Sequence, residues 1–160
     1  GLYLISAKRA LSRLAFEGAS LPKELAKTSA QTLLVPVFIE VSAHEAGQLR
    51  AMIPQLEQAG IVISDFGRAS FLVQAIPSYL EPSCIQDVIR RLLDDEGAIN
   101  DLAVTLAKAC KSSKNQKPLS KEAASHVVKK LLECVNPFQC PAGDKIVAIL
   151  TKSELEKKFR

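Results

Sequence analysis

The spacing of apolar residues changes once along the chain, and that change limits the possible folds more than any other feature. Before Ser83, short apolar runs alternate with helical stretches, whereas after it the spacing stays helical for about fifty residues. Short apolar runs favour strands, and apolar residues three or four positions apart favour one face of a helix. The pattern predicts an α+β chain of about five strands and five or six helices, in two layers around a shared core.

Local sequence signals place the expected elements. Strands are expected at residues 2–5, 33–41, 61–63, 71–76 and 145–150. Asp65–Arg68 suits the tight turn of a hairpin between the third and fourth of these strands. The first helix follows the first strand and runs to Glu17. In the last long helix, the residues expected to face inward are Val127, Val128, Leu131, Leu132 and Val135.

Helix ends are predicted from capping residues. In a capping box, a Ser or Thr side chain accepts a helical N–H while a Glu or Gln reaches back to the capping residue. Such boxes are predicted at Ser42–Glu45, Ser83–Gln86 and Thr151–Glu154. Asn100 and Ser120 are expected to cap two further helices. Gly60 is placed to end the helix that begins at Ala43 in a left-handed conformation.

Composition, apolar run lengths and cysteine spacing argue against a membrane-spanning protein and against a secreted, disulfide-rich one. The 160 residues are 48% hydrophobic and 24% charged, with a net charge of +4, which fits one domain or two small lobes. No apolar run approaches the roughly 20 residues of a membrane span, and no secretory signal is recognisable, so a cytoplasmic location is expected. The four cysteines form no Cys-x-x-Cys pair, and reduced thiols at 84, 110, 134 and 140 are expected.

Three separated motifs are similar to those of one known family. They are Leu33–Glu40, Phe66–Pro77 and the segment from Asn136–Pro141 to Phe159. In this order they resemble the C-terminal domain of the DNA mismatch-repair protein MutL. The resemblance implies a dimerisation subdomain formed by residues 1–36 and 103–160, and an inserted regulatory or external subdomain formed by residues 37–102. It also implies a homodimer, and it assigns ATP and Mg to an upstream region, so no cofactor is expected in this domain.

Many members of this family are metal-dependent endonucleases. Their motif has the form Asp-Gln-His-Ala-x-x-Glu-x-x-x-x-Glu on the first helix and is completed by an Ala-Cys segment and by Cys-Pro-His-Gly-Arg. When the chain is aligned with the family on Leu2–Ile5, it has Ser6, Lys8 and Ser12 in place of Asp, His and the first Glu. Glu17 is retained. Near the end of the chain, Ala142 replaces the His and Asp144 stands where Arg is usual.

A zinc-like cation needs about three or four good donors. Ser6 and Ser12 are weak neutral donors, and Lys8 brings a positive charge. We therefore expect no metal and no catalytic residue, and hence a domain that does not nick DNA. Cys110 and Cys140 match the remaining ligand positions, so a two-thiol site stays open, although free cysteines are more often small core residues.

Residues 31–36, Gln-Thr-Leu-Leu-Val-Pro, have the form Gln-x-hydrophobic-x-x-Pro. In the resembled family this motif docks into a hydrophobic pocket of the bacterial sliding clamp. The residues implied in clamp binding are Gln31, Leu33, Leu34 and Pro36. Gln31 would supply hydrogen bonds, Leu33 would fill an apolar slot and Pro36 would fix the local backbone. The same residues also suit the start of a strand.

Basic residues gather in two places. They are Lys8, Arg9 and Arg13 on the first helix, and Lys108, Lys111, Lys114 and Lys117 around a later loop. Either group could contact phosphates in a salt-dependent way, and with no Trp for stacking we expect only weak, sequence-independent DNA contact. The two histidines, His44 and His126, are expected at the surface and not as catalytic bases.

Three hypotheses about function follow. The leading one is a non-catalytic homodimerisation and partner-binding module of a mismatch-repair protein, with the sliding clamp and other mismatch-repair proteins as partners. The second is a metal-dependent DNA-nicking endonuclease with an atypical site built from Glu17, Cys110 and Cys140. The third is a regulatory domain that binds a small ligand in the middle α/β lobe, which would need a pocket with convergent polar groups.

Overall fold

The computed structural model describes residues 1–20, 30–112 and 118–159. These residues form six α-helices and five strands in two sheets, so the predicted α+β class is confirmed. None of their helices is long and apolar enough to cross a membrane. The strands are β1 Leu2–Ile5, β2 Ala30–Glu40, β3 Val62–Gly67, β4 Ser70–Pro77 and β5 Val147–Leu150. The helices are α1 Ala7–Ala19, α3 Ala43–Gln58, α4 Ile85–Asp94, α5 Leu102–Ser112, α6 Lys121–Glu133 and α7 Lys152–Lys158.

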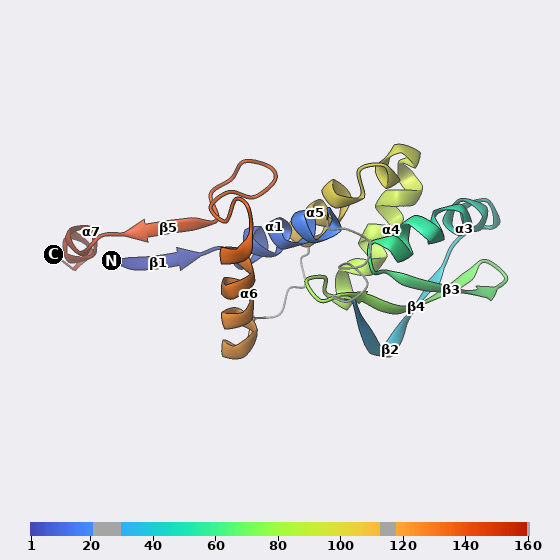
Figure 1. The fold of residues 1–160 in the computed structure, drawn as a ribbon, viewed down its shortest axis with the longest axis horizontal. Coiled ribbons are helices and arrows are strands. Elements are labelled where there is room, and N and C mark those ends of the chain that lie inside the picture. The colour runs from blue at the N-terminus through green and yellow to red at the C-terminus, as the bar shows by residue number, and fades with distance from the viewer. Residues whose placement is uncertain (21–29, 113–117, 160) are drawn as a thin grey trace.

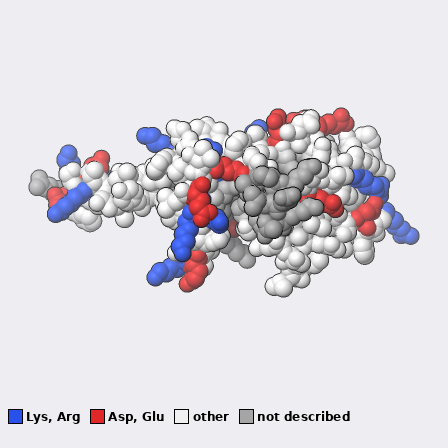
Figure 2. Space-filling view, in the orientation of Figure 1, with Lys and Arg blue, Asp and Glu red and all other residues white. Residues whose placement is uncertain are grey.

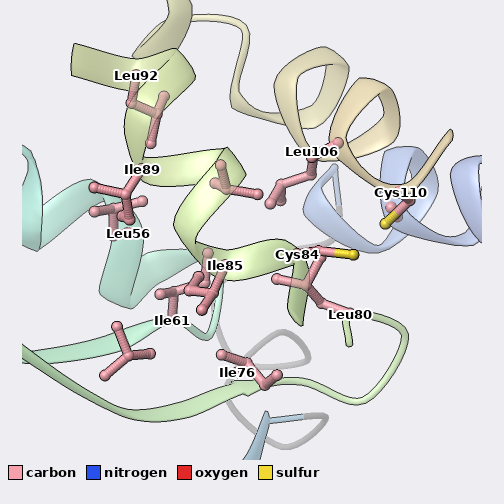
Figure 3. Packing of buried hydrophobic residues seen from close by; sticks show 14 of the residues in the cluster. Leu56, Ile61, Ile76, Leu80, Cys84, Ile85, Ile89, Leu92, Leu106 and Cys110 are labelled. Carbon is pink, nitrogen blue, oxygen red and sulfur yellow. The ribbon is translucent and has the colours of Figure 1, made fainter. Parts of the chain in front are cut away.

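The middle of the chain forms a helix-on-sheet unit. The antiparallel sheet has the order β2-β4-β3, and α3 and α4 cover one of its faces (Figure 1). A cluster of buried apolar side chains fills the core between these layers, and several of them are drawn in Figure 3. Its largest fully buried side chains include Leu49, Leu56, Ile61, Phe71, Ile76, Ile85, Ile89 and Leu92.

The hairpin of β3 and β4 turns later than predicted. Its two loop residues are Arg68 and Ala69, not the predicted Asp65–Arg68, because Gly67 pairs with Ser70. Arg68 and Ala69 both have positive φ, at 50° and 61°, as the right-handed twist of a two-residue hairpin requires. Asp65 lies in the strand instead, and its carboxylate accepts the Gly67 N–H at 2.8 Å.

Helix ends follow the local signals in most cases. Both halves of the predicted capping boxes are present at Ser42–Glu45 and Thr151–Glu154, and Ser120 caps α6 through the Ala123 N–H. Gly60 has a φ of 85° at the end of α3. The Ile61 N–H then donates to the Leu56 carbonyl at 2.9 Å, so the predicted left-handed end is confirmed.

Two cap predictions are wrong. Ser83 and Gln86 form no capping box, because Pro82 begins a short 3₁₀ turn (Pro82–Cys84) that leads directly into α4. Asn100 does not begin α5; it ends another 3₁₀ turn (Glu96–Ile99), and its N–H donates to the Gly97 carbonyl at 3.1 Å.

The two ends of the described chain pair with each other. β1 and β5 form an antiparallel two-stranded sheet, with Tyr3 opposite Ile149. This sheet projects from the body of the molecule and carries α7 and both termini at its far end (Figure 1). Nearer the body, α1 packs against α5 and α6, where Ala10, Leu106 and Leu131 are buried. The predicted subdomain limit at 36/37 falls inside β2, so the division into 1–36, 37–102 and 103–160 stays a prediction.

The inward face of α6 is smaller than predicted. Val127 and Leu131 are buried, whereas Leu132 is exposed, as is Val135, which lies after the helix has ended at Glu133. The sequence pattern placed these two residues in the core because they continue the apolar spacing. In this chain nothing among the described residues covers them.

Candidate interaction surfaces and the metal-motif positions

The paired strands β1 and β5, called the ribbon below, form an apolar surface that is not covered by a second layer of secondary structure. All four residues of β1 are exposed, and Tyr3 and Ile149 keep 65% and 56% of their surface accessible. Figure 2 shows this part of the molecule free of charged side chains between α7 and the body. A two-stranded sheet is at best marginally stable alone in water. The ribbon therefore has the properties of a surface that is buried by another chain.

Both faces of the ribbon are apolar. Side chains alternate along a strand, so Leu2 and Leu4 lie on one face and Tyr3 and Ile5 on the other. In a strand with one face in water, every second residue is normally polar. The absence of such alternation in Leu2–Ile5 indicates in the sequence that both faces are buried, but it does not distinguish burial within this chain from burial by a second chain.

The predicted clamp motif forms a bulge on β2. Thr32 pairs with Ala75 and Val37 with Val73, so the four residues 33–36 lie opposite the single residue Gln74. Leu34 is fully exposed, and Gln31 and Pro36 are also exposed. Leu33, which the motif assigns to an apolar slot, is partly buried and packs against the core. Three of the four motif residues are therefore exposed to solvent, Leu34 and Pro36 in the bulge and Gln31 just before it.

The metal-motif positions on α1 have structural partners. Ser12 is buried, and its hydroxyl donates to the Ala107 carbonyl at 2.9 Å. Glu17, the retained carboxylate, accepts the N–H groups of Val135 at 3.0 Å and Asn136 at 3.4 Å. It also lies 3.5 Å from the Arg13 guanidinium. Glu17 therefore joins α1 to the segment after α6.

The two thiols at ligand positions have different partners. Cys110 on α5 is buried beside Cys84, at the start of α4, and their side chains are drawn in Figure 3. The hydrogen bond between the Cys110 thiol and Cys84, and to a lesser extent burial, raise the pKa of Cys110. Cys140 instead lies 3.7 Å from a carboxylate oxygen of Asp144. All four cysteines are free thiols.

An ion pair lies beside Cys140. The Lys111 ammonium donates to the Asp144 carboxylate, which lowers the pKa of Asp144 and raises the pKa of Lys111. This pair joins α5 to the loop that carries Ala142, which is exposed and offers no donor. Within the described parts of the chain, no three or more His, Cys, Asp or Glu side chains are grouped so as to hold a metal ion. The donors present do not fit the metal of the family motif.

The residues proposed for DNA contact differ in their availability. Arg13 is buried, and its Nε donates to the Gln139 carbonyl at 2.7 Å, so it does not face solvent. Arg9 donates to the Lys145 carbonyl at 2.8 Å. Lys8 and Lys108 are exposed. Lys114 and Lys117 lie outside the described residues. His44 and His126 are exposed, as predicted.

A cavity of about 260 Å³ lies between α1, α6 and Tyr79. The Tyr79 hydroxyl is buried and has no hydrogen-bond partner among the described residues. Burial raises the pKa of this hydroxyl. The tyrosine ring lies directly against Gly18 of α1, where a Cβ atom would fall 2.2 Å from Tyr79 Cε1. This cavity is separate from the ribbon and from the bulge.

Comparison with known proteins identifies relatives that match almost every residue of this chain. Proteins named DNA mismatch repair protein MutL match essentially the whole chain. The protein from Halothermothrix orenii is 30% identical over 98% of the chain, that from Pediococcus pentosaceus 26% over 100%, and that from Streptococcus pneumoniae strain CGSP14 30% over 100%. The chain spans 26% of the length of each of these relatives.

A family profile matches a large part of the same chain. The profile described as the MutL C terminal dimerisation domain covers residues 1–118, which include β1, the β2 bulge and the helices up to α5. A family defined by dimerisation agrees with an apolar ribbon that no other described part of the chain covers. By its sequence and by this uncovered surface, the chain belongs to the MutL C-terminal dimerisation domain family.

Proposed function

We propose that this domain joins two copies of its chain through the ribbon and docks partner proteins in mismatch repair, without cutting DNA. The observation that carries the proposal is the exposure of apolar side chains on both faces of β1 and β5. Burying such surface stabilises an association by about 25 cal/mol for each Å² of apolar area. A symmetric interface uses the same patch on both chains, so every ribbon residue contributes twice.

Substitution of one ribbon residue tests this interface. Tyr3→Lys would place a charge at the interface in both copies. It would not disturb the core of the single chain, because the Tyr3 side chain is already 65% exposed there. A loss of about 1.4 kcal/mol per copy would weaken association about a hundredfold over the two copies. Light scattering after size exclusion, over a range of protein concentrations, measures the change.

Phe66→Lys is the matched control. Phe66 is an aromatic residue of nearly equal exposure, 68%, at the tip of the β3–β4 hairpin. We expect Phe66→Lys to remain dimeric at concentrations where Tyr3→Lys is monomeric, with both variants keeping the wild-type circular dichroism spectrum. Equal dimer stability of the two variants would place the interface elsewhere.

The absence of nicking activity is supported by the contacts of the motif residues. Glu17 bonds to two main-chain N–H groups, and the thiols of Cys110 and Cys140 have separate partners. Elemental analysis and relaxation of supercoiled plasmid with Mn²⁺ test this part of the proposal. We expect neither bound zinc nor nicking. Stoichiometric zinc together with Mn²⁺-dependent nicking would instead support the endonuclease hypothesis.

Docking to the bacterial sliding clamp is supported by the bulge. Residues 33–36 do not pair with β4, and Gln31 and Leu34 are exposed, so a partner can contact them without opening the sheet. We expect Gln31→Ala with Leu34→Ala to abolish binding to a purified clamp, with no loss of domain stability. Thr32→Ala, also exposed, is the control. Clamp affinity that is equal in the double variant and the control would reject this docking site.

The wider role follows from dimerisation and stays part of the proposal. Two joined domains would hold together two upstream ATP-binding halves, which close around DNA when they meet. The action of this domain would be mechanical, with weak salt-dependent DNA contact to which the exposed Lys8 contributes. ATP and Mg would act only in the upstream region, and the other mismatch-repair proteins would bind the assembled dimer.

A further inference from the structure

A hollow lies at the base of the ribbon, where β1 and β5 meet the body of the molecule. It has a volume of about 290 Å³. Both strands contribute apolar walls, and the rim carries two cations; the wall residues are Leu4, Ile5, Val147 and Ala148, and the rim residues are Arg9 and Lys145. An apolar cavity of about 150 Å³ can hold a benzene molecule, so this hollow has room for one aromatic ring.

Hydrogen bonds hold the hollow in shape within a single chain. The Ser6 N–H donates to the Ile146 carbonyl at 2.9 Å, and the Arg9 guanidinium donates to the Lys145 carbonyl at 2.8 Å. These bonds join the start of α1 to the segment that leads into β5. A second chain can therefore fill the hollow without any rearrangement of the main chain around it.

An aromatic side chain without a packing surface lies at the opposite end of the ribbon. Phe159 directly follows α7 and is 90% exposed. Leu155, four positions earlier and on the same side of the helix, is partly buried. Figure 1 places α7 beyond the far end of β1 and β5, and Phe159 is not one of the residues that line the hollow of its own chain. The ring and the hollow are therefore separated by the length of the ribbon.

The shape of the molecule decides how two ribbons can meet. In Figure 1 and Figure 2 the body is broader than the ribbon. Two ribbons that pointed the same way would bring the two bodies together before the ribbons touched. A two-fold axis across the ribbons instead places the bodies at opposite ends and lets the ribbons touch along their length. In that arrangement the far end of each ribbon lies against the base of the other.

We propose that the two ribbons pair in opposite directions and that Phe159 of each copy enters the hollow of the other copy. This inference rests on the proposed dimerisation through the ribbon and specifies its geometry. One chain supplies the ring and the other supplies the apolar walls, so the site is complete only in the dimer. The two-fold symmetry gives two such sites, one at each end of the paired ribbons.

The charges next to the ring agree with this arrangement. Glu156 lies three positions before the ring and shares its side of α7, whereas Lys157 lies two positions before it, on the other side. Glu156 would therefore approach the rim cations Arg9 and Lys145 of the partner. Its contact with Lys152, at 3.9 Å, joins two exposed side chains and contributes little that would hold it back.

Cross-linking between two introduced thiols tests this geometry. The double variant carries Lys145→Cys at the rim of the hollow and Phe159→Cys after α7. A disulfide requires Cα atoms within about 7 Å, whereas the four residues of β5 alone span about 10 Å, so this pair can form only between two copies. We expect oxidation by diamide to give a covalent dimer on non-reducing electrophoresis for the double variant and not for either single variant. Every variant also carries Cys134→Ser, because the other three native thiols are buried.

Two control variants at the β3–β4 hairpin match these changes. Phe66 is also an exposed aromatic residue, at 68%, and lies away from the ribbon. Phe66→Cys combined with Lys145→Cys measures cross-linking by random collision. We also expect Phe159→Ala to weaken dimerisation at least about tenfold in light scattering, because two rings leave the interface of each dimer, and Phe66→Ala to leave it unchanged.

Three outcomes would overturn this inference. If the Phe159→Cys single variant cross-links as readily as the double variant, the ribbons point the same way. If the wild type is dimeric but the double variant cross-links no more than the Phe66 control, Phe159 lies outside the partner's hollow. In both cases dimerisation through the ribbon still stands. A wild-type chain that stays monomeric in light scattering at every concentration would instead refute the proposed dimerisation, and this inference with it.

Discussion

Replacing Glu17 with Gln distinguishes a structural carboxylate from a metal ligand. Glu17 accepts one main-chain N–H at 3.0 Å and a second at 3.4 Å, and it lies 3.5 Å from Arg13. A hydrogen bond to a charged group contributes about 1.5–3 kcal/mol, and the two longer contacts add less. The side-chain amide of Gln keeps one accepting oxygen, but its NH₂ group would face one of the two main-chain N–H donors, so that hydrogen bond is lost. We therefore expect Glu17→Gln to lower the free energy of unfolding by about 1–2 kcal/mol.

Urea unfolding followed by circular dichroism, at one fixed protein concentration, measures this change in stability. The melting temperature should fall by about 2–4 °C for each kcal/mol in a chain of this size. The exposed Glu57→Gln variant on α3 provides the matched control. If the two variants were equally stable, and if zinc stabilised the wild type but not Glu17→Gln, Glu17 would be a metal ligand and the structural account would be refuted.

Three further predictions concern the packing of α1, the hairpin and the charges. Gly18→Ala should destabilise the domain by about 1–3 kcal/mol, measured by urea unfolding, because its Cβ would lie 2.2 Å from Tyr79 Cε1. Ala69→Gly should raise the urea midpoint, since relief of a left-handed conformation, about 1–2 kcal/mol, exceeds the entropy cost of Gly, about 0.5–1 kcal/mol; a lower midpoint would contradict this. Lys111 lowers the folded-state pKa of Asp144. The charged Asp144 therefore stabilises the folded state above about pH 4, and this stabilisation is lost on acidification. Asp144→Asn should therefore lose less stability than the wild type between about pH 5 and about pH 3.

Features set by neighbouring residues were predicted well from the sequence. The boxes at Ser42–Glu45 and Thr151–Glu154 depend only on side chains three positions apart, and both formed. The left-handed Gly60 is likewise a local requirement of a helix end. Ser83–Gln86 has the same pattern but forms no capping box, because Ser83 lies inside the 3₁₀ turn that begins at Pro82.

Features that depend on distant residues could not be derived from spacing. Lys111 and Asp144 are 33 positions apart and meet only because the last loop folds back onto α5. Gly67 suggested an earlier hairpin turn, but the pairing of β3 with β4 placed Arg68 and Ala69 in the loop. Apolar periodicity also cannot distinguish a side chain that is buried within its own chain from one that is available to contact another chain. For this reason the pattern predicted burial for Leu132 and Val135, which are exposed.

Hydrogen exchange as a function of protein concentration tests most directly whether the ribbon joins two chains. Mass spectrometry would follow the amides of β1 and β5, with the β3–β4 hairpin as an internal reference. The account predicts that exchange at 2–5 and 147–150 slows in proportion to the dimer fraction, while exchange at 62–70 does not change. A dimer whose formation leaves exchange in β1 and β5 unchanged and protects another surface would contradict it.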